Sequence, residues 1–167
     1  MESSDLVVIR DYDPSWPHAF ANLAAKIRTA MGSLILSVEH IGSTAVPGLA
    51  AKPIIDLDVV LASVADLAEA IDRLSAIGYS HEGDLGVPGR HAFHSPPGEA
   101  LHHLYVLAAG ADELRRHLAF RDALRESELL RCHYSALKRC LAETFKGDRS
   151  SYTRAKSVFI ASVIGTD

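Results

Sequence analysis

Two apolar segments joined by a short loop rich in glycine and proline constrain this chain more than any other feature. Residues 34–41 and 54–61 have the length and the Val/Ile/Leu content of β-strands, and a Gly-Ser pair at 42–43 opens the loop between them. The second segment carries Asp56 and Asp58, which strand periodicity places on one face. Because two adjacent carboxylates in an apolar strand resist burial unless a positive partner lies between them, the sequence predicts a divalent metal ion there.

The loop itself is a candidate phosphate site. Gly42 and Ser43 offer free backbone N–H groups to a phosphate, and twelve residues separate Ser43 from Asp56. A Mg²⁺ ion held by Asp56 and Asp58 could bridge to that phosphate. Lys52 lies in the same loop, where it either meets the phosphate as a point charge or is a solvated lysine.

The spacing of the Gly-Ser pair and the Asp-x-Asp strand resembles the signature of the polymerase-β-type nucleotidyltransferase superfamily. The longer string at 40–56, His-Ile-Gly-Ser-Thr-Ala-Val-Pro-Gly-Leu-Ala-Ala-Lys-Pro-Ile-Ile-Asp, is similar to the GrpB family, a group of small proteins assigned to that superfamily by similarity. Supporting matches lie at 12–16, 77–79, 102–104, 120–125 and 134–138, and at Tyr152 and Lys156.

The resemblance implies an activity, a metal-dependent transfer of a nucleotidyl group from an NTP to a small acceptor. Asp56 and Asp58 would hold the metal, Mg²⁺ or Mn²⁺, and Gly42 and Ser43 would hold the phosphates.

The chain also departs from the superfamily pattern in one respect. In the superfamily a third carboxylate usually lies on a strand beside the Asp-x-Asp strand, but this chain has no acid between Glu99 and Asp112. His103, on the same strand face as Tyr105, is our candidate for the third metal ligand and for a catalytic role beside the two aspartates. The alternative is that His103 and its neighbour His102 are packed, hydrogen-bonded strand residues. His91 and His94 are weaker candidates for the same pocket.

Arg121 is the second basic residue that we consider for the phosphate. It lies on an apolar helical stripe, where an arginine needs a partner. Either Arg121 pairs with a structural carboxylate or it points toward a phosphate. Lys138 and Lys156 flank later apolar stripes and could reach inward, although such lysines are more often at the surface.

The patterns together predict the α/β (α+β) class, with a nucleotidyltransferase-like mixed sheet, flanking helices and a C-terminal helical section. We expect a single domain over 1–167, in which 1–110 form the sheet core and 111–167 about three helices. The expected strands are 6–9, 34–41, 54–61 and a hairpin of 90–94 with 101–107, and the expected early helices run from Pro14 to Met31 and from Ser63 to Ile77.

The composition limits the kinds of partner that we expect for this protein. With 17 Lys and Arg against 21 Asp and Glu, the net charge of −4 does not suit a protein that grips long nucleic acid. No apolar run has the roughly 18 residues of a membrane helix, and the first residues lack a signal-peptide pattern, so we expect a cytoplasmic protein. The expected partners are a nucleotide and a small molecule.

Two other functions fit the same residues. The missing third acid favours a nucleotide- or metabolite-binding module that has lost catalysis. In an interaction domain without a ligand, Asp56 and Asp58 would be vestigial. Metal-dependent release of pyrophosphate from an NTP distinguishes the enzyme from both.

Overall fold

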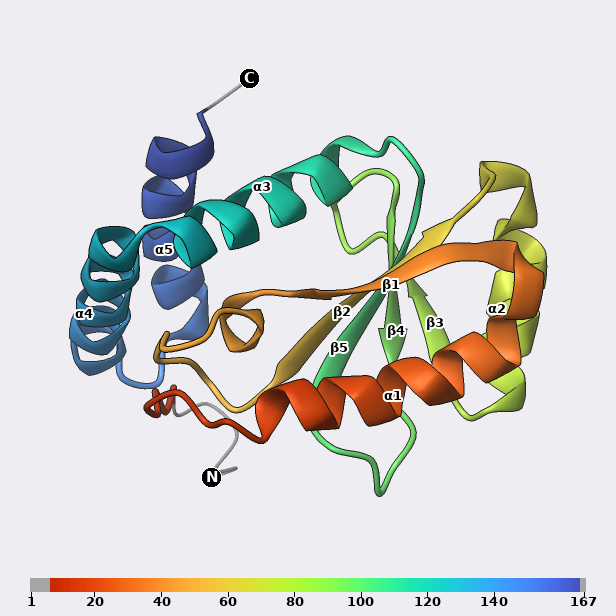
Figure 1. The fold of residues 1–167 in the computed structure, drawn as a ribbon, viewed down its shortest axis with the longest axis horizontal. Helices are drawn as coiled ribbons and strands as arrows, with labels where there is room; N and C mark the ends of the chain where they lie inside the picture. Colours follow the sequence, from red (N-terminus) through yellow and green to blue (C-terminus); the bar gives the residue numbers. More distant parts are fainter. Residues whose placement is uncertain (1–6, 166–167) are drawn as a thin grey trace.

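A five-stranded sheet with helices on both faces forms the protein in a computed structural model that describes residues 7–165 (Figure 1). The elements in chain order are α1 (Trp16–Met31), the 3-10 turn η1 (Gly32–Leu34), β1 (Ile35–Ile41), the 3-10 turn η2 (Ser43–Ala45), β2 (Ile55–Leu61), the 3-10 turn η3 (Val64–Asp66), α2 (Leu67–Ala76), β3 (Ser80–Gly83), β4 (Arg90–His94), β5 (His102–Ala108), α3 (Asp112–Glu126), α4 (Glu128–Thr144) and α5 (Arg149–Ile164).

The sheet is mixed, with the strand order β1-β2-β5-β4-β3. Neighbouring strands are antiparallel except β2 and β5, which are parallel. β2 is an interior strand, as its apolar flanks require. The register places Asp56 beside His103 of β5. Two residues further along, it places Asp58 beside Tyr105.

The face of the sheet toward α1 and α2 is apolar. Leu57 and Val59 of β2, with Leu104 and Val106 of β5, point toward α1 and α2 and are almost completely buried. Burial of one such aliphatic side chain stabilises a fold by about 1.5–3 kcal/mol, so this layer anchors the sheet. The alternate residues, including Asp56 and Asp58, therefore face the other side.

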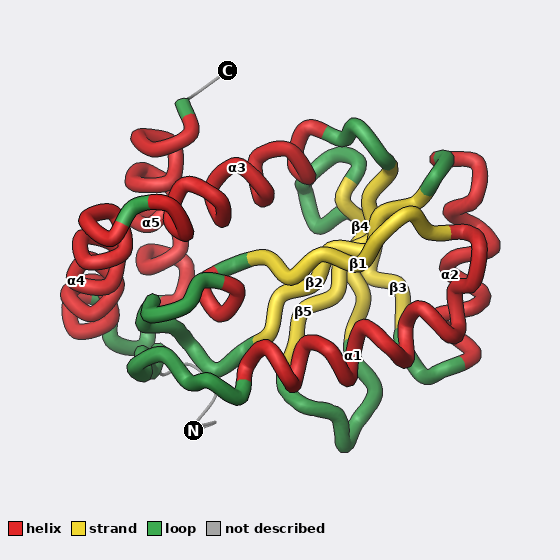
Figure 2. Tube along the Cα trace, viewed as in Figure 1, coloured by secondary structure: helices red, strands yellow, loops and turns green. Residues whose placement is uncertain are grey.

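The helices of the C-terminal section cover that second face. Leu114 of α3 packs against Val60 and Leu107 near one end of the strands. Beyond the other end, residues 42–54 run as a loop beside α4 and α5 (Figure 2). Val46 of this loop is fully buried in a cluster with Leu124 of α3 and Tyr134 of α4. The C-terminal helices therefore fix the loop that carries Gly42 and Ser43.

The structure confirms the predicted fold class, a mixed α+β sheet with a C-terminal helical section. The strand expected at 6–9 is wrong for residues 7–9, where only the adjoining Arg10 forms an isolated bridge, to Ala51, and Leu6 lies outside the described residues. The first helix begins at Trp16 rather than Pro14. The sequence does not predict β3, because its Ser-His-Glu-Gly segment lacks apolar alternation.

None of the helices within residues 7–165 combines the length and the apolar content that crossing a membrane requires.

Candidate functional site

Asp56 and Gly42 lie against each other at the end of the β1–β2 pair. Gly42 directly follows β1 and has a φ of 71°, in the left-handed region that favours glycine. A Cβ atom at this position would overlap with Oδ2 of Asp56. Only glycine therefore allows the loop backbone to lie against the Asp56 carboxylate.

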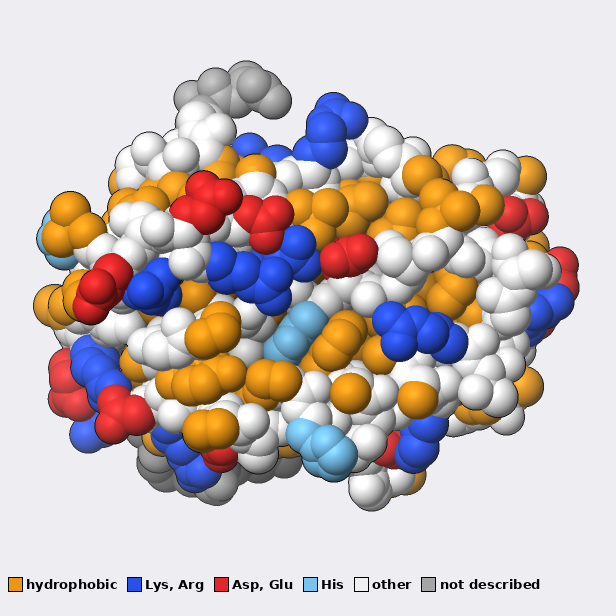
Figure 3. All heavy atoms as spheres, viewed as in Figure 1, with side chains coloured by type: hydrophobic (Ala, Val, Ile, Leu, Met, Phe, Trp, Pro, Cys, Tyr) orange, Lys and Arg blue, Asp and Glu red, His pale blue; other side chains and the backbone are white. Residues whose placement is uncertain are grey.

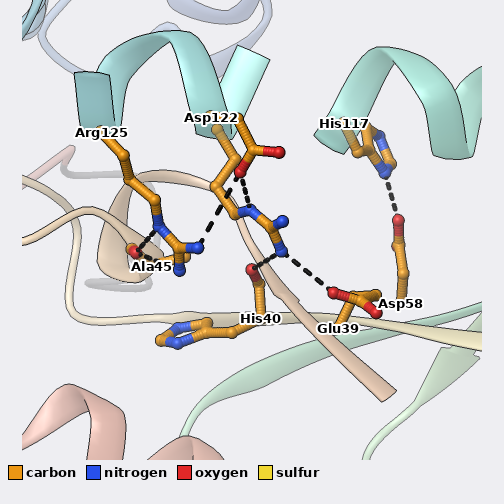
Figure 4. A network of polar contacts seen from close by, with 8 residues as sticks. Glu39, His40, Ala45, Asp58, His117, Asp122 and Arg125 are labelled. Carbon is orange, nitrogen blue, oxygen red and sulfur yellow. Dashed lines mark hydrogen bonds and ion pairs between the residues drawn. The ribbon is translucent and has the colours of Figure 1, made fainter. Parts of the chain in front are cut away.

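Asp58 lies deeper, with its side chain fully buried. Its Oδ2 accepts a hydrogen bond from Nδ1 of His117 on α3, at 2.6 Å (Figure 4). Its Oδ1 is also buried and has no hydrogen-bond partner among the described residues. Burial raises the pKa of Asp58, and the contact with His117 opposes that rise.

His117 links Asp58 to a further acid. Its Nε2 donates to Oε1 of Glu113, one helical turn earlier, at 3.1 Å. Burial acts to lower the pKa of His117, but hydrogen bonds to two carboxylates outweigh it and raise the pKa to about 9. An imidazolium therefore lies between Asp58 and Glu113.

The three predicted metal ligands lie on one sheet face, but in different surroundings. Nδ1 of His103 donates to Oδ1 of Asp56 at 2.8 Å, and both side chains are partly exposed. Within residues 7–165 no group of three His, Cys, Asp or Glu side chains has the arrangement of a metal site. The two carboxylates nonetheless fit a divalent cation, because Asp58 Oδ1 is a buried oxygen that lacks a partner.

A cavity of about 320 Å³ opens in front of Asp56. Its walls come from the end of β1, from β2, β4 and β5, and from all three C-terminal helices. The lining residues are Ile41, Gly42, Ser43, Asp56, Arg90, Tyr105, Glu113, Arg116, His117, Phe120, Tyr134, Lys156, Ser157 and Ile160. Asp58 does not line this cavity, because it lies beneath His117.

A smaller cavity of about 60 Å³ adjoins the first, and both are lined by Ser43, Asp56 and Lys156. Two further ammonium groups line the smaller one, those of Lys52 and Lys138. The cavity thus brings three lysines near a single carboxylate.

Lys138 is the most deeply buried of these lysines, with 2% of the residue exposed. Its Nζ donates to Oγ of Ser43 at 2.8 Å and to the Ala50 carbonyl, and it lies 4.5 Å from the ring centre of Tyr134. Burial, assisted by the nearby charge of Lys156, lowers the pKa of Lys138 to about 7.

The other two lysines flank one aromatic ring. Nζ of Lys52 lies 4.6 Å from the ring centre of Tyr152, and Nζ of Lys156 lies 5.1 Å from it. Burial lowers the pKa of Lys52 to about 8 and also lowers that of Lys156.

Arg121 has carboxylate partners of its own and lines neither of these two cavities. Its guanidinium donates to Glu39 at 3.1 Å, to the neighbouring Asp122 at 2.8 Å and to the His40 carbonyl at 3.2 Å. Figure 4 shows this network beside the contact of Arg125 with the Ala45 carbonyl. These contacts tie α3 to β1 and to the Gly-Ser loop.

The remaining histidine candidates lie away from Asp56. His102 is buried, with its ring bonded to the Tyr79 hydroxyl and to the Ala100 carbonyl. His91 contacts His81 on β3, and His94 is exposed.

Sequence reasoning missed several cavity residues: Glu113, His117, Arg90 and Arg116. Glu113 and His117 stand four residues apart and hence on one helix face, a signal that was available. Arg90 and Arg116 gave no comparable signal, because only the tertiary fold brings them to the cavity.

Curated relatives place the chain in a family. The family model described as "GrpB protein" matches residues 6–165. A UPF0157 protein of Halalkalibacterium halodurans is 36% identical over 161 residues, which cover 95% of this chain and 80% of that protein. The UPF0157 protein YqkA of Bacillus subtilis is 31% identical over 149 residues, and the chain spans only 43% of its length.

Solved structures agree with this placement. The conserved protein GrpB from Enterococcus faecalis superimposes with a TM-score of 0.84 at 34% identity, over 93% of this chain and 94% of that one. The Cid1 poly(U) polymerase bound to MgATP has a TM-score of 0.53 at 12% identity, over 77% of this chain and 42% of that one, which shows a nucleotidyltransferase-like fold. The chain belongs to the GrpB family.

Proposed function

We propose that this protein binds a nucleoside triphosphate together with a divalent metal ion and transfers the nucleotidyl group to a small acceptor. The observation that carries the proposal is the position of Asp56. It lies where the two cavities meet, against the Gly42 backbone and on the same sheet face as Asp58. The fold shared with Cid1, whose solved structures contain a UTP analogue or MgATP, supports a nucleotide as the ligand.

The smaller cavity suits the triphosphate. Three ammonium groups converge there on the Ser43 side of Asp56, and burial has removed much of their hydration. A polyanion would restore their charge interactions and favour their protonated forms. Arg121 was the other predicted phosphate ligand, but it already has Glu39 and Asp122 as partners, so we assign the phosphates to the lysines and to Gly42 and Ser43.

Asp56 and Asp58, with His103 as a third ligand, would hold Mg²⁺ or Mn²⁺. When bound, such an ion neutralises negative charge on the phosphates and on the attacking and leaving oxygens. His117 fixes the rotamer of Asp58 by its hydrogen bond, and Glu113 in turn orients the His117 ring.

The transfer is a single displacement. An acceptor hydroxyl oxygen forms a bond to the α-phosphorus, and its proton passes to water in the cavity. The bond from the α-phosphorus to the bridging oxygen breaks, and pyrophosphate leaves with the electron pair toward the lysines. The residues of the chain position and neutralise the reactants, which is the main contribution proteins make to this chemistry.

Release of pyrophosphate from each of the common NTPs, with Mg²⁺ or Mn²⁺ and a panel of small alcohols, tests the activity. The parent protein should release pyrophosphate only with metal, and Asp56→Asn should reduce the rate by about a hundredfold or more. Asp72→Asn, at an exposed position on α2, is the matched control and should keep the parental rate.

A binding module without catalysis is the second candidate, and one observation favours it. The β5 positions beside Asp56 and Asp58 carry His103 and Tyr105 instead of a carboxylate. This candidate predicts metal-dependent stabilisation of the protein by nucleotides with no pyrophosphate release under any condition.

A further inference from the structure

Arg90 is a cation of the larger cavity that has no acidic partner. It opens β4, and its guanidinium lies 4.5 Å from the ring centre of Tyr105. Its Nε is buried without a hydrogen-bond acceptor, and Arg90 makes no ion pair within residues 7–165. Stacking on Tyr105 orients the guanidinium but satisfies none of its five N–H groups.

The two acids that line the cavity, Asp56 and Glu113, contact other basic groups and form no ion pair with Arg90. Glu113 accepts from His117 at 3.1 Å and lies 3.7 Å from Arg116. Asp56 accepts from His103. Because a buried N–H without a hydrogen-bond acceptor destabilises a protein, the position of Arg90 favours a hydrogen-bond acceptor that comes from outside the chain.

The place of Arg90 in the sheet indicates which substrate carries the group that Arg90 would bind. Gly42 and Ser43 follow β1, Asp56 lies on β2, and Arg90 lies on β4. In the order β1-β2-β5-β4, the Gly-Ser loop and Arg90 are three strand spacings apart, about 14 Å across the sheet, and Asp56 lies on a strand between them. Arg90 pairs with Leu107, four residues along β5 from the partner of Asp56, so it is also displaced by about 13 Å along the strands.

The geometry of an in-line displacement indicates which substrate binds near the Gly-Ser loop and which binds near Arg90. The entering and leaving oxygens lie on opposite sides of the α-phosphorus. If pyrophosphate leaves toward Ser43 and the lysines, the acceptor approaches from the side of Arg90. A group bound by Arg90 then belongs to the acceptor and not to the triphosphate.

We propose that Arg90 forms an oxyanion site for the acceptor, so that the protein modifies a small hydroxyl compound carrying a carboxylate or a phosphate. The planar guanidinium matches either oxyanion with two parallel hydrogen bonds. Arg116 of α3, which lines the same cavity, adds a second positive charge. The inference rests on the proposed function and adds the chemical class of the acceptor to it.

Three small hydroxyl compounds test the site: neutral glycerol, the carboxylate glycerate and the phosphate ester glycerol 3-phosphate. Each is titrated, by NMR or calorimetry, into the protein saturated with Mg²⁺ and an ATP analogue whose bridge between the α- and β-phosphates cannot be cleaved. The parent protein should bind at least one charged probe about tenfold more tightly than glycerol, and which one it prefers separates a carboxylate site from a phosphate site. Arg90→Gln should abolish the preference.

Arg115→Gln is the matched control, because Arg115 is an exposed arginine of α3 and should leave the preference intact. Arg90→Lys keeps the charge and should restore part of the preference. Loss of the preference in a variant that melts like the parent supports the site. A preference that survives Arg90→Gln, or equal binding of glycerol and both charged probes to the parent, overturns it.

The same titration without nucleotide separates this inference from the proposed function. If no nucleotide binds, the proposed function fails, but the charged probes still report on Arg90. Lys138→Met should then keep the preference that Arg90→Gln loses. If the nucleotide binds and Arg90→Gln changes nothing, the proposed function stands and the acceptor site does not.

Discussion

Gly42 and Lys138 are residues of the candidate site whose positions cost stability. Gly42 takes a positive φ so that the loop backbone lies against Asp56. Lys138 carries an ammonium group into the interior, where its partners are a hydroxyl, a carbonyl and an aromatic ring. Costs of this kind are common at functional sites, because activity and stability make different demands on the same residue.

The contact of Gly42 with Asp56 is testable with alanine. Gly42→Ala should destabilise the protein for two reasons, an unfavourable φ and overlap with the carboxylate. Gly48→Ala is the matched control, because Gly48 has a φ of 80° but no atom within 4 Å of an added Cβ. Denaturant unfolding should show a cost of about 1–2 kcal/mol for Gly48→Ala and roughly 1–3 kcal/mol more for Gly42→Ala. Equal costs would show that the approach to Asp56 is not tight.

Lys138 predicts a pH dependence of stability. Its pKa is about 7 in the folded protein and 10.5 as the ordinary value, so between these the unfolded chain binds more protons. The free energy of unfolding contributed by Lys138 therefore rises with pH across this window, and its penalty is greatest below about pH 7. Lys138→Met should stabilise the protein at about pH 6, by on the order of 2–4 kcal/mol, and this advantage should shrink toward about pH 10. An advantage that does not change with pH would contradict the assignment.

Among the elements, α3 joins the site to the sheet. Its successive turns carry Glu113, His117 and Arg121, which all face β1 and β2. The first two hold Asp58, and Arg121 holds Glu39. The helix therefore fixes both Asp58 and the strand that leads into the Gly-Ser loop.

Arg121→Ala should mainly reduce stability, because it leaves Glu39 and the His40 carbonyl without their donor. With 12% of the Arg121 side chain exposed, the expected loss is about 1–3 kcal/mol in the free energy of unfolding. Nucleotide affinity, measured by calorimetry, should change by less than about threefold. Arg115→Ala, whose ion pair with Asp112 is solvent-exposed, should cost less than about 1 kcal/mol. A large loss of affinity with unchanged stability would show that Arg121 binds the phosphates.

The elements that the sequence predicts well are those with strong periodicity. The strands around Asp56 and the β4–β5 hairpin emerge from apolar alternation and from Pro and Gly positions. The same patterns do not predict β3, because an exposed edge strand of four polar or small residues has no apolar side to bury. Its pairing with β4 depends on contacts that a local pattern does not contain.

The site is predictable only where its residues are close in sequence. Gly42, Ser43 and Asp56 lie within one loop and one strand, so their spacing is informative. Lys138 donates to Ser43 across 95 positions of sequence, and helical periodicity alone makes it resemble a surface lysine. The role of Arg90 cannot be predicted from the sequence either, because its burial depends on how β4 packs beside Tyr105.

At the scale of the whole molecule, the site depends on both parts of the chain. The sheet supplies the carboxylates, and the C-terminal helices supply Lys138, Lys156 and the cavity walls. On the face shown in Figure 3, basic side chains lie among acidic and apolar ones instead of forming one continuous strip. This distribution suits a compact polyanion held in a cavity better than a long nucleic acid laid across a surface.

We propose above all that Asp56 and Asp58 hold a divalent ion that the nucleotide needs for binding. The most direct measurement is calorimetric titration of ATP with Mg²⁺, with Mn²⁺ and with a metal chelator. For the parent and for Asp72→Asn, removal of the metal should weaken binding by about tenfold or more. For Asp58→Asn, with its folding checked by thermal melting, the metal should make no difference. An Asp58→Asn protein that binds ATP and metal as the parent does would show that these two aspartates do not hold the metal.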